Sequence, residues 1–213
     1  GVIVQLGGQT PLKLSKFKES NKIKILGTPY DSIDLAEDRD RFKELVHDLK
    51  LNQPENSIVY NYKEAKKIID RLNFPVVIRP SYVLGGRAMR IIYNKKSLDS
   101  YFKDETLIPN RAILIDKFLN DAKEVDVDAI SDGNDVFVCG ILEHIEEAGI
   151  HSGDSACSLP PLTLSRKLIK YIEEITKKIS KKLKIKGLIN IQFALKDNQV
   201  FLIEVNPRAS RTI

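Results

Sequence analysis

The sequence has no tryptophan, one methionine and two cysteines, and aromatic residues make up only 7% of it. Cys139 and Cys157 lie far apart, without the clustered spacing of a disulfide framework or a zinc site. His144 and His151 are also without a cysteine or histidine at metal-ligand spacing. We therefore expect reduced thiols, a cytoplasmic protein and no zinc centre.

Long apolar runs are also missing. No stretch approaches the roughly 18 apolar residues of a membrane helix, and no signal-peptide pattern opens the chain. We therefore expect a soluble protein that does not bind membranes. The single methionine, Met89, is internal, and Ile213 follows directly on a dense polar run. This suggests that the sequence is an excerpt of a longer protein.

The net charge of +5 raises the question of nucleic-acid binding. The lysines mostly lie in predicted helices, as at 177–182, where they alternate with isoleucine and leucine and predict a solvated helix face. Few aromatics and no stacking motif also argue against a basic nucleic-acid-binding module, which remains the alternative from a different class. With 42% hydrophobic residues, the chain can form one large or two small domains.

The first fifty residues predict the end of a βαβ unit and a further helix. Residues 2–5 and 23–26 have strand patterns, and a helix between them ends near Ser20. Asp34 is predicted to cap the next helix, whose apolar face consists of Phe42, Leu45, Val46 and Leu49.

The remainder predicts a mixed α/β chain with a glycine-rich loop, a turn at 132–134 and a final hairpin. Strands are expected from Ser57 and at 76–79, 88–93, 112–115, 124–130 and 135–139, and helices from about Lys63, from Ser97 and at 162–183.

In the final hairpin, apolar and polar residues alternate along 188–195 and 200–206. Pairing Phe193 with Ile203 on the buried side places Gln192 opposite Glu204 and requires an odd-length turn at 197–199. The buried side is then expected to hold Ile189, Ile191, Phe193, Leu195, Phe201, Ile203 and Val205.

That register gathers the side-chain oxygens of Gln192, Glu204 and Asn206 on one face. Hard oxygen ligands suit Mg²⁺, which completes its shell with water and phosphate oxygens. Arg208 and Arg211 follow at once and add positive charge where a transferring phosphoryl group needs it. An exposed polar face with satisfied hydrogen bonds is the alternative.

Three other segments carry candidate chemistry. Gly85 and Gly86 lie between two predicted strands and permit a turn whose backbone amides can approach phosphates. Their spacing is not that of a Walker loop, and a simple hairpin turn would explain the two glycines equally well. Residues 124–128 place three carboxylates on one strand face, which either take part in a functional site or simply face solvent. Residues 118–119 offer backbone and apolar contacts to an adenine.

Seven segments, in order and over nearly the whole chain, resemble landmarks of the carbamoyl phosphate synthetase large subunit. They are GVIVQLGGQTPLKL, AEDRDRF, RPSYVLGGRAM, EVDVDAI, EHIEEAGIHSGDSACSLP, GLINIQFA and FLIEVNPRASRT. That family has two similar halves, each an ATP-grasp unit. The ends of the glycine loop and of the last segment resemble the second, C-terminal half, which phosphorylates carbamate.

The resemblance implies a mixed α/β (α+β) fold, an ATP-grasp fold preceded by the tail of a pre-ATP-grasp α/β domain. Residues 1–30 would be that Rossmann-like tail and 31–55 a linking helix. Residues 56–116 would form the small subdomain with the glycine-rich loop, and 117–213 the large subdomain, truncated at its C-terminus.

The resemblance also implies site residues. Arg39 and Arg79 would touch phosphates, Gly85 and Gly86 would form a flexible lid, Lys117 and Leu119 would line the adenine pocket, and Glu124 would hold the ribose. Lys117 departs from the bacterial pattern, which has histidine there. Nucleotide contacts would also come from Gly149, Ile150, His151 and Ser152, metal ligands from Gln192, Glu204 and Asn206, and catalytic groups from Asn206, Arg208 and Arg211.

The implied reaction is ATP-dependent phosphorylation of carbamate with Mg²⁺ or Mn²⁺, within carbamoyl phosphate synthesis from glutamine or ammonia, bicarbonate and two ATP, for arginine and pyrimidine biosynthesis. The implied partners are the remainder of the large subunit and a glutaminase small subunit, without which the fragment is expected to be inactive. Another ATP-grasp ligase, such as a biotin-dependent carboxylase, would share the hairpin and the glycine loop but not EHIEEAGIHSGDSACSLP.

Overall fold

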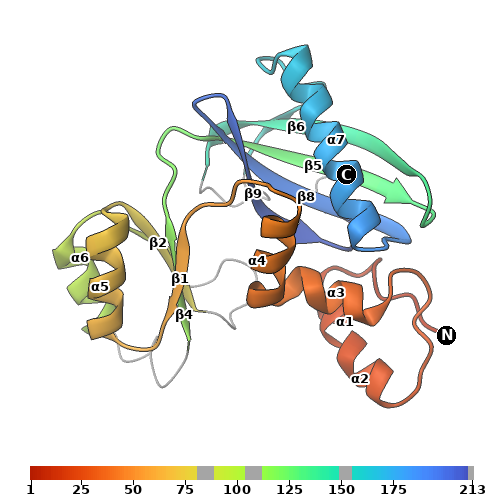
Figure 1. Ribbon diagram of the computed structural model, residues 1–213, viewed down its shortest axis with the longest axis horizontal. Helices are drawn as coiled ribbons and strands as arrows, with labels where there is room; N and C mark the ends of the chain where they lie inside the picture. The colour runs from red at the N-terminus through yellow and green to blue at the C-terminus, as the bar shows by residue number, and fades with distance from the viewer. Residues whose placement is uncertain (81–88, 104–111, 149–154, 211–213) are drawn as a thin grey trace. The chain divides into compact units, whose positions relative to one another are not determined.

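The computed structural model describes residues 1–80, 89–103, 112–148 and 155–210. They form two compact units, one made of Gly1–Gln53 with Asp121–Ile213 and the other of Pro54–Asn120 (Figure 1). Within these described ranges, no helix is both long enough and apolar enough to span a membrane. The predicted glycine-rich loop falls at 81–88, outside the described residues.

The unit Pro54–Asn120 is a four-stranded antiparallel sheet with two helices beside it (Figure 1). Helix α5 begins where Asn61 accepts a hydrogen bond from the Glu64 amide at 2.9 Å, and the Glu64 carboxylate accepts one from the Tyr60 amide at 2.8 Å. Tyr101 and Ile69 pack in its core. In the order β1-β4-β2-β3, the strands are Asn56–Val59, Ile113–Lys117, Val76–Pro80 and Arg90–Ile92, and the helices are α5 (Tyr62–Leu72) and α6 (Lys95–Lys103).

The other unit is built on a five-stranded antiparallel sheet with the order β7-β6-β5-β8-β9. Helix α7 (Arg166–Lys182) covers one face with Ile172, Ile175 and Ile179 (Figure 1). It begins four residues later than predicted, because Ser165 caps it by accepting from the Leu168 amide. The strands are β5 (Lys123–Ser131), β6 (Val136–Glu147), β7 (Cys157–Ser158), β8 (Gly187–Lys196) and β9 (Gln199–Asn206). Strand β6 therefore extends well beyond the predicted 135–139.

The N-terminal segment of this unit contains four helices and little sheet. The two strands predicted around the first helix meet only in a parallel bridge between Val2 and Ile25. Their parallel direction agrees with the expected βαβ order. The helices are α1 (Gln9–Lys13), α2 (Ser15–Ser20), α3 (Tyr30–Glu37) and α4 (Arg39–Asp48).

The predicted helix cap at Asp34 is wrong. Asp34 lies inside α3, where its carboxylate binds Arg41 at 2.6 Å and accepts from the Tyr30 hydroxyl at 3.2 Å. Asp38 caps α4 by accepting from the Arg41 amide at 3.0 Å. The chain therefore turns between two helices where the sequence suggested one, and both contribute apolar residues to the core under the sheet.

The hairpin register is confirmed at Gln192 and Glu204, but the odd-length turn and the Phe193–Ile203 pair are wrong. Asp197 and Asn198 form a two-residue turn with φ values of 51° and 60°, a backbone region that Asp and Asn tolerate. A β-bulge between Gln192 and Phe193 takes up the difference, so Phe193 pairs with Leu202. On β9 the buried apolar residues are therefore Val200, Leu202 and Val205 rather than Phe201, Ile203 and Val205.

Glu143 on β6 ties the sheet to the segment before α7. Its buried carboxylate accepts from Lys123 Nζ at 2.6 Å, from the Leu162 and Thr163 amides at 2.8 Å each, and from the Thr163 hydroxyl. Burial alone would raise the pKa of this carboxyl, but the hydrogen bonds from Lys123 and Thr163 hold the pKa at about 2.

Because the folded-state pKa lies below that of an unfolded glutamate, Glu143 stabilises the fold above about pH 4.5 and loses this effect as the pH falls toward 2. We expect Glu143→Gln to lower the free energy of unfolding at pH 7 by about 2 kcal/mol in urea titrations. The exposed Glu174→Gln on α7 should change it by less than about 0.5 kcal/mol. Equal effects of the two variants would refute this role.

Candidate functional site

The face of the five-stranded sheet opposite α7 carries two rows of polar side chains. Val125, Val127 and Ile191 point into the apolar core, so the residues that alternate with them point the other way. Strand pairing aligns them across β5, β8 and β9. We call these six residues the polar face: Asp126, Gln192 and Glu204 in one row, and Asp128, Asn190 and Asn206 in the next.

Hydrogen bonds connect the second row to the first. The carboxamide of Asn206 donates from Nδ2 to Glu204 Oε1 at 2.6 Å and to Asn190 Oδ1 at 3.5 Å. Asn190 in turn donates to Asp128 Oδ1 at 3.4 Å. Gln9 of α1 reaches the same group and donates from Nε2 to Asn206 Oδ1 at 3.1 Å. Asn206 is thus fixed on both sides of its amide.

Several oxygen atoms at this face are buried without a hydrogen-bond partner, namely Asp126 Oδ1, Asp128 Oδ2 and Gln9 Oε1. Asp126 is 1% exposed and Asp128 7%. Buried acceptors without donors are costly, and they mark places where a ligand, an ion or water completes the structure. Gln192, Glu204 and Asn206 add further side-chain oxygens to the same face, and oxygen is the ligand type that Mg²⁺ and Mn²⁺ prefer.

Burial raises the pKa of Asp128 to about 6, although the side chains of Asn190 and Ser210 donate to its carboxyl. The negative charge of Asp126 raises the pKa further, whereas Arg208 acts in the opposite sense. The polar face therefore holds more acidic charge than its own hydrogen bonds balance, which favours a bound cation.

We expect the contribution of Asp128 to the free energy of unfolding of the ion-free chain to fall by about 2 kcal/mol as the pH rises from about 4 to about 6. The reason is that Asp128 ionises at lower pH when unfolded than when folded. In the variant Asp128→Asn this fall should disappear, as measured by urea unfolding in EDTA over that pH range. If the variant keeps the fall, Asp128 is not its source.

A second cluster lies beside the polar face, where ligand atoms of Glu124, Asp126 and His144 lie within 4.8 Å of one another. His144 Nε2 is 3.1 Å from Asp126 Oδ2, and its Nδ1 is 3.0 Å from the Ser155 hydroxyl. Burial lowers the pKa of His144, but the hydrogen bond to Asp126 and the charges of Glu124 and Glu146 outweigh it and raise the pKa overall. Local spacing around His144 does not reveal this cluster, because its two other members, Glu124 and Asp126, belong to the neighbouring strand β5.

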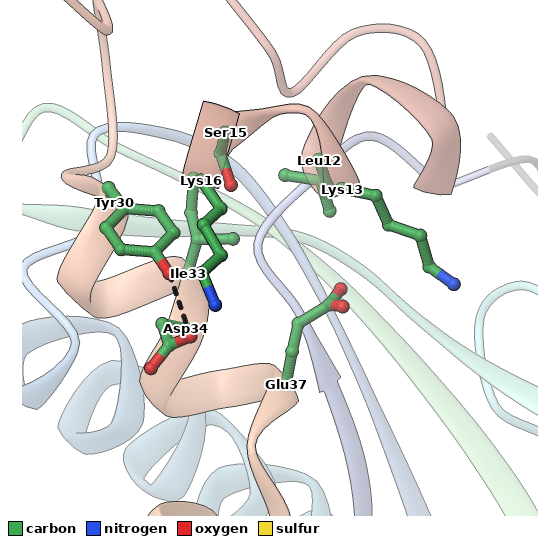
Figure 2. A pocket seen from close by; sticks show the side chains of 8 residues that line it. All are labelled: Leu12, Lys13, Ser15, Lys16, Tyr30, Ile33, Asp34 and Glu37. Carbon is green, nitrogen blue, oxygen red and sulfur yellow. Dashed lines mark hydrogen bonds between the residues drawn. The ribbon is translucent and has the colours of Figure 1, made fainter. Parts of the chain in front are cut away.

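A separate pocket of about 180 Å³ lies among α1, α2 and α3. Figure 2 shows the Tyr30 hydroxyl bonded to Asp34 on one side of it and Glu37 beside Leu12 and Lys13 on the other. The pKa of Glu37 is raised chiefly by loss of solvent around its carboxyl, although the residue as a whole is exposed. Lys13 and Arg208 lower this pKa and Glu204 raises it, so Glu37 is electrostatically coupled to the end of the hairpin.

The predicted site residues are divided among the two units and the segments outside the described residues. Glu124, Gln192, Glu204, Asn206 and Arg208 share the sheet unit, as does Arg39 at the start of α4. Arg208 follows β9 and donates its amide to the Asn206 carbonyl at 2.7 Å. Outside the described residues lie Gly85, Gly86, Gly149, Ile150, His151, Ser152 and Arg211.

Of the predicted site residues that the structure describes, three belong to the unit Pro54–Asn120. Arg79 on β2 pairs with Asp116 of the adjacent β4 at 3.3 Å. Lys117 ends β4 and donates from Nζ to the Asn73 carbonyl at 3.1 Å. Leu119 follows two residues later and is half-buried.

Sequence reasoning missed Gln9 and Asn190. Asn190 could have been found, because it alternates with Gln192 on the same strand and has the same residue chemistry as Asn206. Gln9 could not, because its contact with Asn206 spans 197 residues of chain and depends on how the N-terminal segment packs.

Solved structures with this fold define its class. An ADP complex of N5-carboxyaminoimidazole ribonucleotide synthetase superposes with a TM-score of 0.81 over 99% of this chain and 54% of its own, at 18% identity. D-alanine–D-alanine ligase from Helicobacter pylori gives 0.74 over 98% of this chain and 65% of its own, at 20% identity. The mixed α/β architecture with its two antiparallel sheets is therefore the ATP-grasp fold predicted from the sequence.

The sequence comparisons identify the family. Residues 38–213 match the model of the carbamoyl-phosphate synthase L chain, ATP binding domain. The carbamoyl phosphate synthase large chain of Archaeoglobus fulgidus is 55% identical over all of this chain and 20% of its own length. The C-terminal section of the Aquifex aeolicus large chain is 52% identical over all of this chain and 40% of its own length.

The chain therefore belongs to the family of carbamoyl-phosphate synthase large-chain ATP-binding domains, which confirms the resemblance seen in the sequence. It spans about a fifth of the length of the full-length large chains that it matches.

Proposed function

We propose that this chain is the ATP-binding part of the second, carbamate-phosphorylating half of a carbamoyl phosphate synthase large chain. The observation that carries the proposal is the polar face, where Gln192, Glu204 and Asn206 stand side by side on paired strands and Arg208 follows directly. The match to a relative described as a C-terminal section of the large chain supports the choice of half.

A divalent cation, Mg²⁺ or Mn²⁺, would be held by Gln192, Glu204 and Asn206 and would offset the charge of the ATP phosphates. The residues fit this role, since their oxygens share one face beside buried acceptors without partners. Arg208 and Arg211 would neutralise charge on the transferring phosphoryl group and on carbamate.

We propose nucleotide-binding roles for the remaining predicted site residues. Arg39 and Arg79 would bind phosphates, and Glu124 the ribose. Lys117 and Leu119 would border the adenine. Further contacts would come from the predicted lid and loop residues, Gly85, Gly86, Gly149, Ile150, His151 and Ser152.

In the proposed step, a carbamate oxygen attacks the γ-phosphorus of ATP in line with the leaving oxygen of ADP. One oxygen–phosphorus bond forms as the other breaks, and the products are carbamoyl phosphate and ADP. The side chains orient and neutralise the reactants and form no covalent bond with them.

Carbamate is unstable in water, so it would have to be delivered inside a larger assembly. We propose the remainder of the large subunit as the source of carbamate and a glutaminase small subunit as the source of ammonia. In the same proposal, residues 1–30 end a pre-ATP-grasp domain, 31–55 link it to the grasp fold, and 56–116 and 117–213 form its small and large subdomains.

Binding of Mg·ATP tests the metal face. In calorimetric titrations of the folded chain, we expect saturable binding that weakens at least tenfold in Glu204→Gln, because a ligand oxygen and its charge are lost. Glu174→Gln on α7 is the matched control and should bind as the wild type does. Equal binding by all three proteins would place the metal elsewhere.

The reverse reaction tests the substrate. A full-length protein carrying this chain should make ATP from carbamoyl phosphate and Mg·ADP, and Arg208→Ala should slow this by about 10²-fold or more, as for other groups that neutralise transition-state charge. The chain alone should make no carbamoyl phosphate from bicarbonate and glutamine. Absence of ATP synthesis by the wild-type protein, with ATP use that depends on biotin instead, would favour a biotin-dependent carboxylase.

A further inference from the structure

Gln9 connects the N-terminal segment to the proposed metal ligand Asn206. It begins α1, directly after Gly7 and Gly8, and its Nε2 donates to Asn206 Oδ1 at 3.1 Å. Asn206 is 3% exposed, so water does not compete for this contact. The conspicuous GGQTP segment has no role in the proposed binding of ATP and metal, and this contact brings it to the polar face.

The orientation of both amides follows from Glu204. Its carboxylate is an acceptor, so Asn206 must turn Nδ2 toward it, and the two atoms lie 2.6 Å apart. Asn206 Oδ1 therefore faces Gln9, which must present Nε2 as the donor. This leaves Gln9 Oε1 buried and without a hydrogen-bond partner.

Binding of a divalent cation by Glu204 and Asn206 reverses this requirement. An N–H group repels a cation, so the Asn206 carboxamide must offer Oδ1 to the ion and turn Nδ2 away from Glu204. Nδ2 then needs an acceptor on the side where Gln9 lies. The Gln9 amide carries such an acceptor in Oε1, so it can bond either orientation of Asn206.

We propose that Gln9 is a positioning residue that exchanges its donor for its acceptor when the metal binds and so holds the Asn206 oxygen toward the ion. The inference rests on the proposed function only in taking Asn206 and Glu204 as metal ligands. It assigns the N-terminal segment a part in metal binding through a single side chain.

The test compares the wild-type protein with Gln9 variants, each as a full-length protein carrying this chain. The affinity for Mn²⁺ is measured in the presence of ADP from the electron paramagnetic resonance signal of free Mn²⁺. In Gln9→Leu, which offers neither donor nor acceptor, one class of Mn²⁺ sites should weaken about tenfold or more, as for other residues that orient metal ligands. In Gln9→Glu, which can only accept, that class should bind Mn²⁺ at least as tightly as in the wild type.

Gln5→Leu is the matched control from the same segment. The Gln5 amide donates to Thr28 Oγ1 at 2.9 Å and to the Leu188 carbonyl at 3.2 Å, and no polar-face residue is among its partners. This variant should lower the melting temperature and leave Mn²⁺ affinity unchanged. Gln9→Met serves as the second apolar variant if circular dichroism shows that Gln9→Leu is unfolded.

Three outcomes would overturn the proposal: wild-type affinity in the apolar Gln9 variants, equal weakening in Gln9→Glu and Gln9→Leu, or the same weakening in Gln5→Leu. Failure of the proposed function gives a different result. A wild-type protein that binds Mn²⁺ but makes no ATP from carbamoyl phosphate and ADP would refute the carbamate reaction and leave the Gln9 comparison intact.

Discussion

The antiparallel pairing of β5, β8 and β9 is the constraint on which the rest of this molecule depends. Because side chains alternate along each strand, a single register decides which residues enter the core with α7 and which form the polar face. A slip of one residue would bury Gln192 and Glu204 and expose Ile191 and Val205. The apolar face therefore fixes the site, since its burial against α7 strongly favours one register.

The polar face buries oxygen atoms that have no hydrogen-bond partner, and this opposes folding. Asp126, Asp128, Asn190 and Asn206 are all buried, and two of the carboxylate oxygens have no partner. Such an arrangement costs stability, and the cation that we propose for this site would supply the missing charge. The buried carboxylate of Glu143, by contrast, accepts hydrogen bonds on both of its oxygens, and these bonds hold the sheet to the segment before α7.

Local sequence patterns predicted most elements correctly, and their errors have local physical causes. The Gln192–Glu204 pair followed from alternation, because a two-residue period is visible in the chain itself. The bulge beyond it was not visible, since an unpaired residue such as Ile203 breaks the alternation without any special residue type. Asp34 and Asp38 are both good caps by composition, and only the turn between α3 and α4 decides in favour of Asp38.

By itself, the sequence determined the family, the ATP-grasp class and the pairing of Gln192 with Glu204 in the final hairpin, because these depend on residue order and on periods of two to four residues. Tertiary structure alone decided which distant residues join them. His144 meets Asp126 across neighbouring strands, and Gln9 meets Asn206 across 197 residues of chain. Contacts of that kind depend on how whole helices and strands pack together. The apolar core supplies most of the free energy for this packing, so the residues that form the contact carry no local pattern that predicts it.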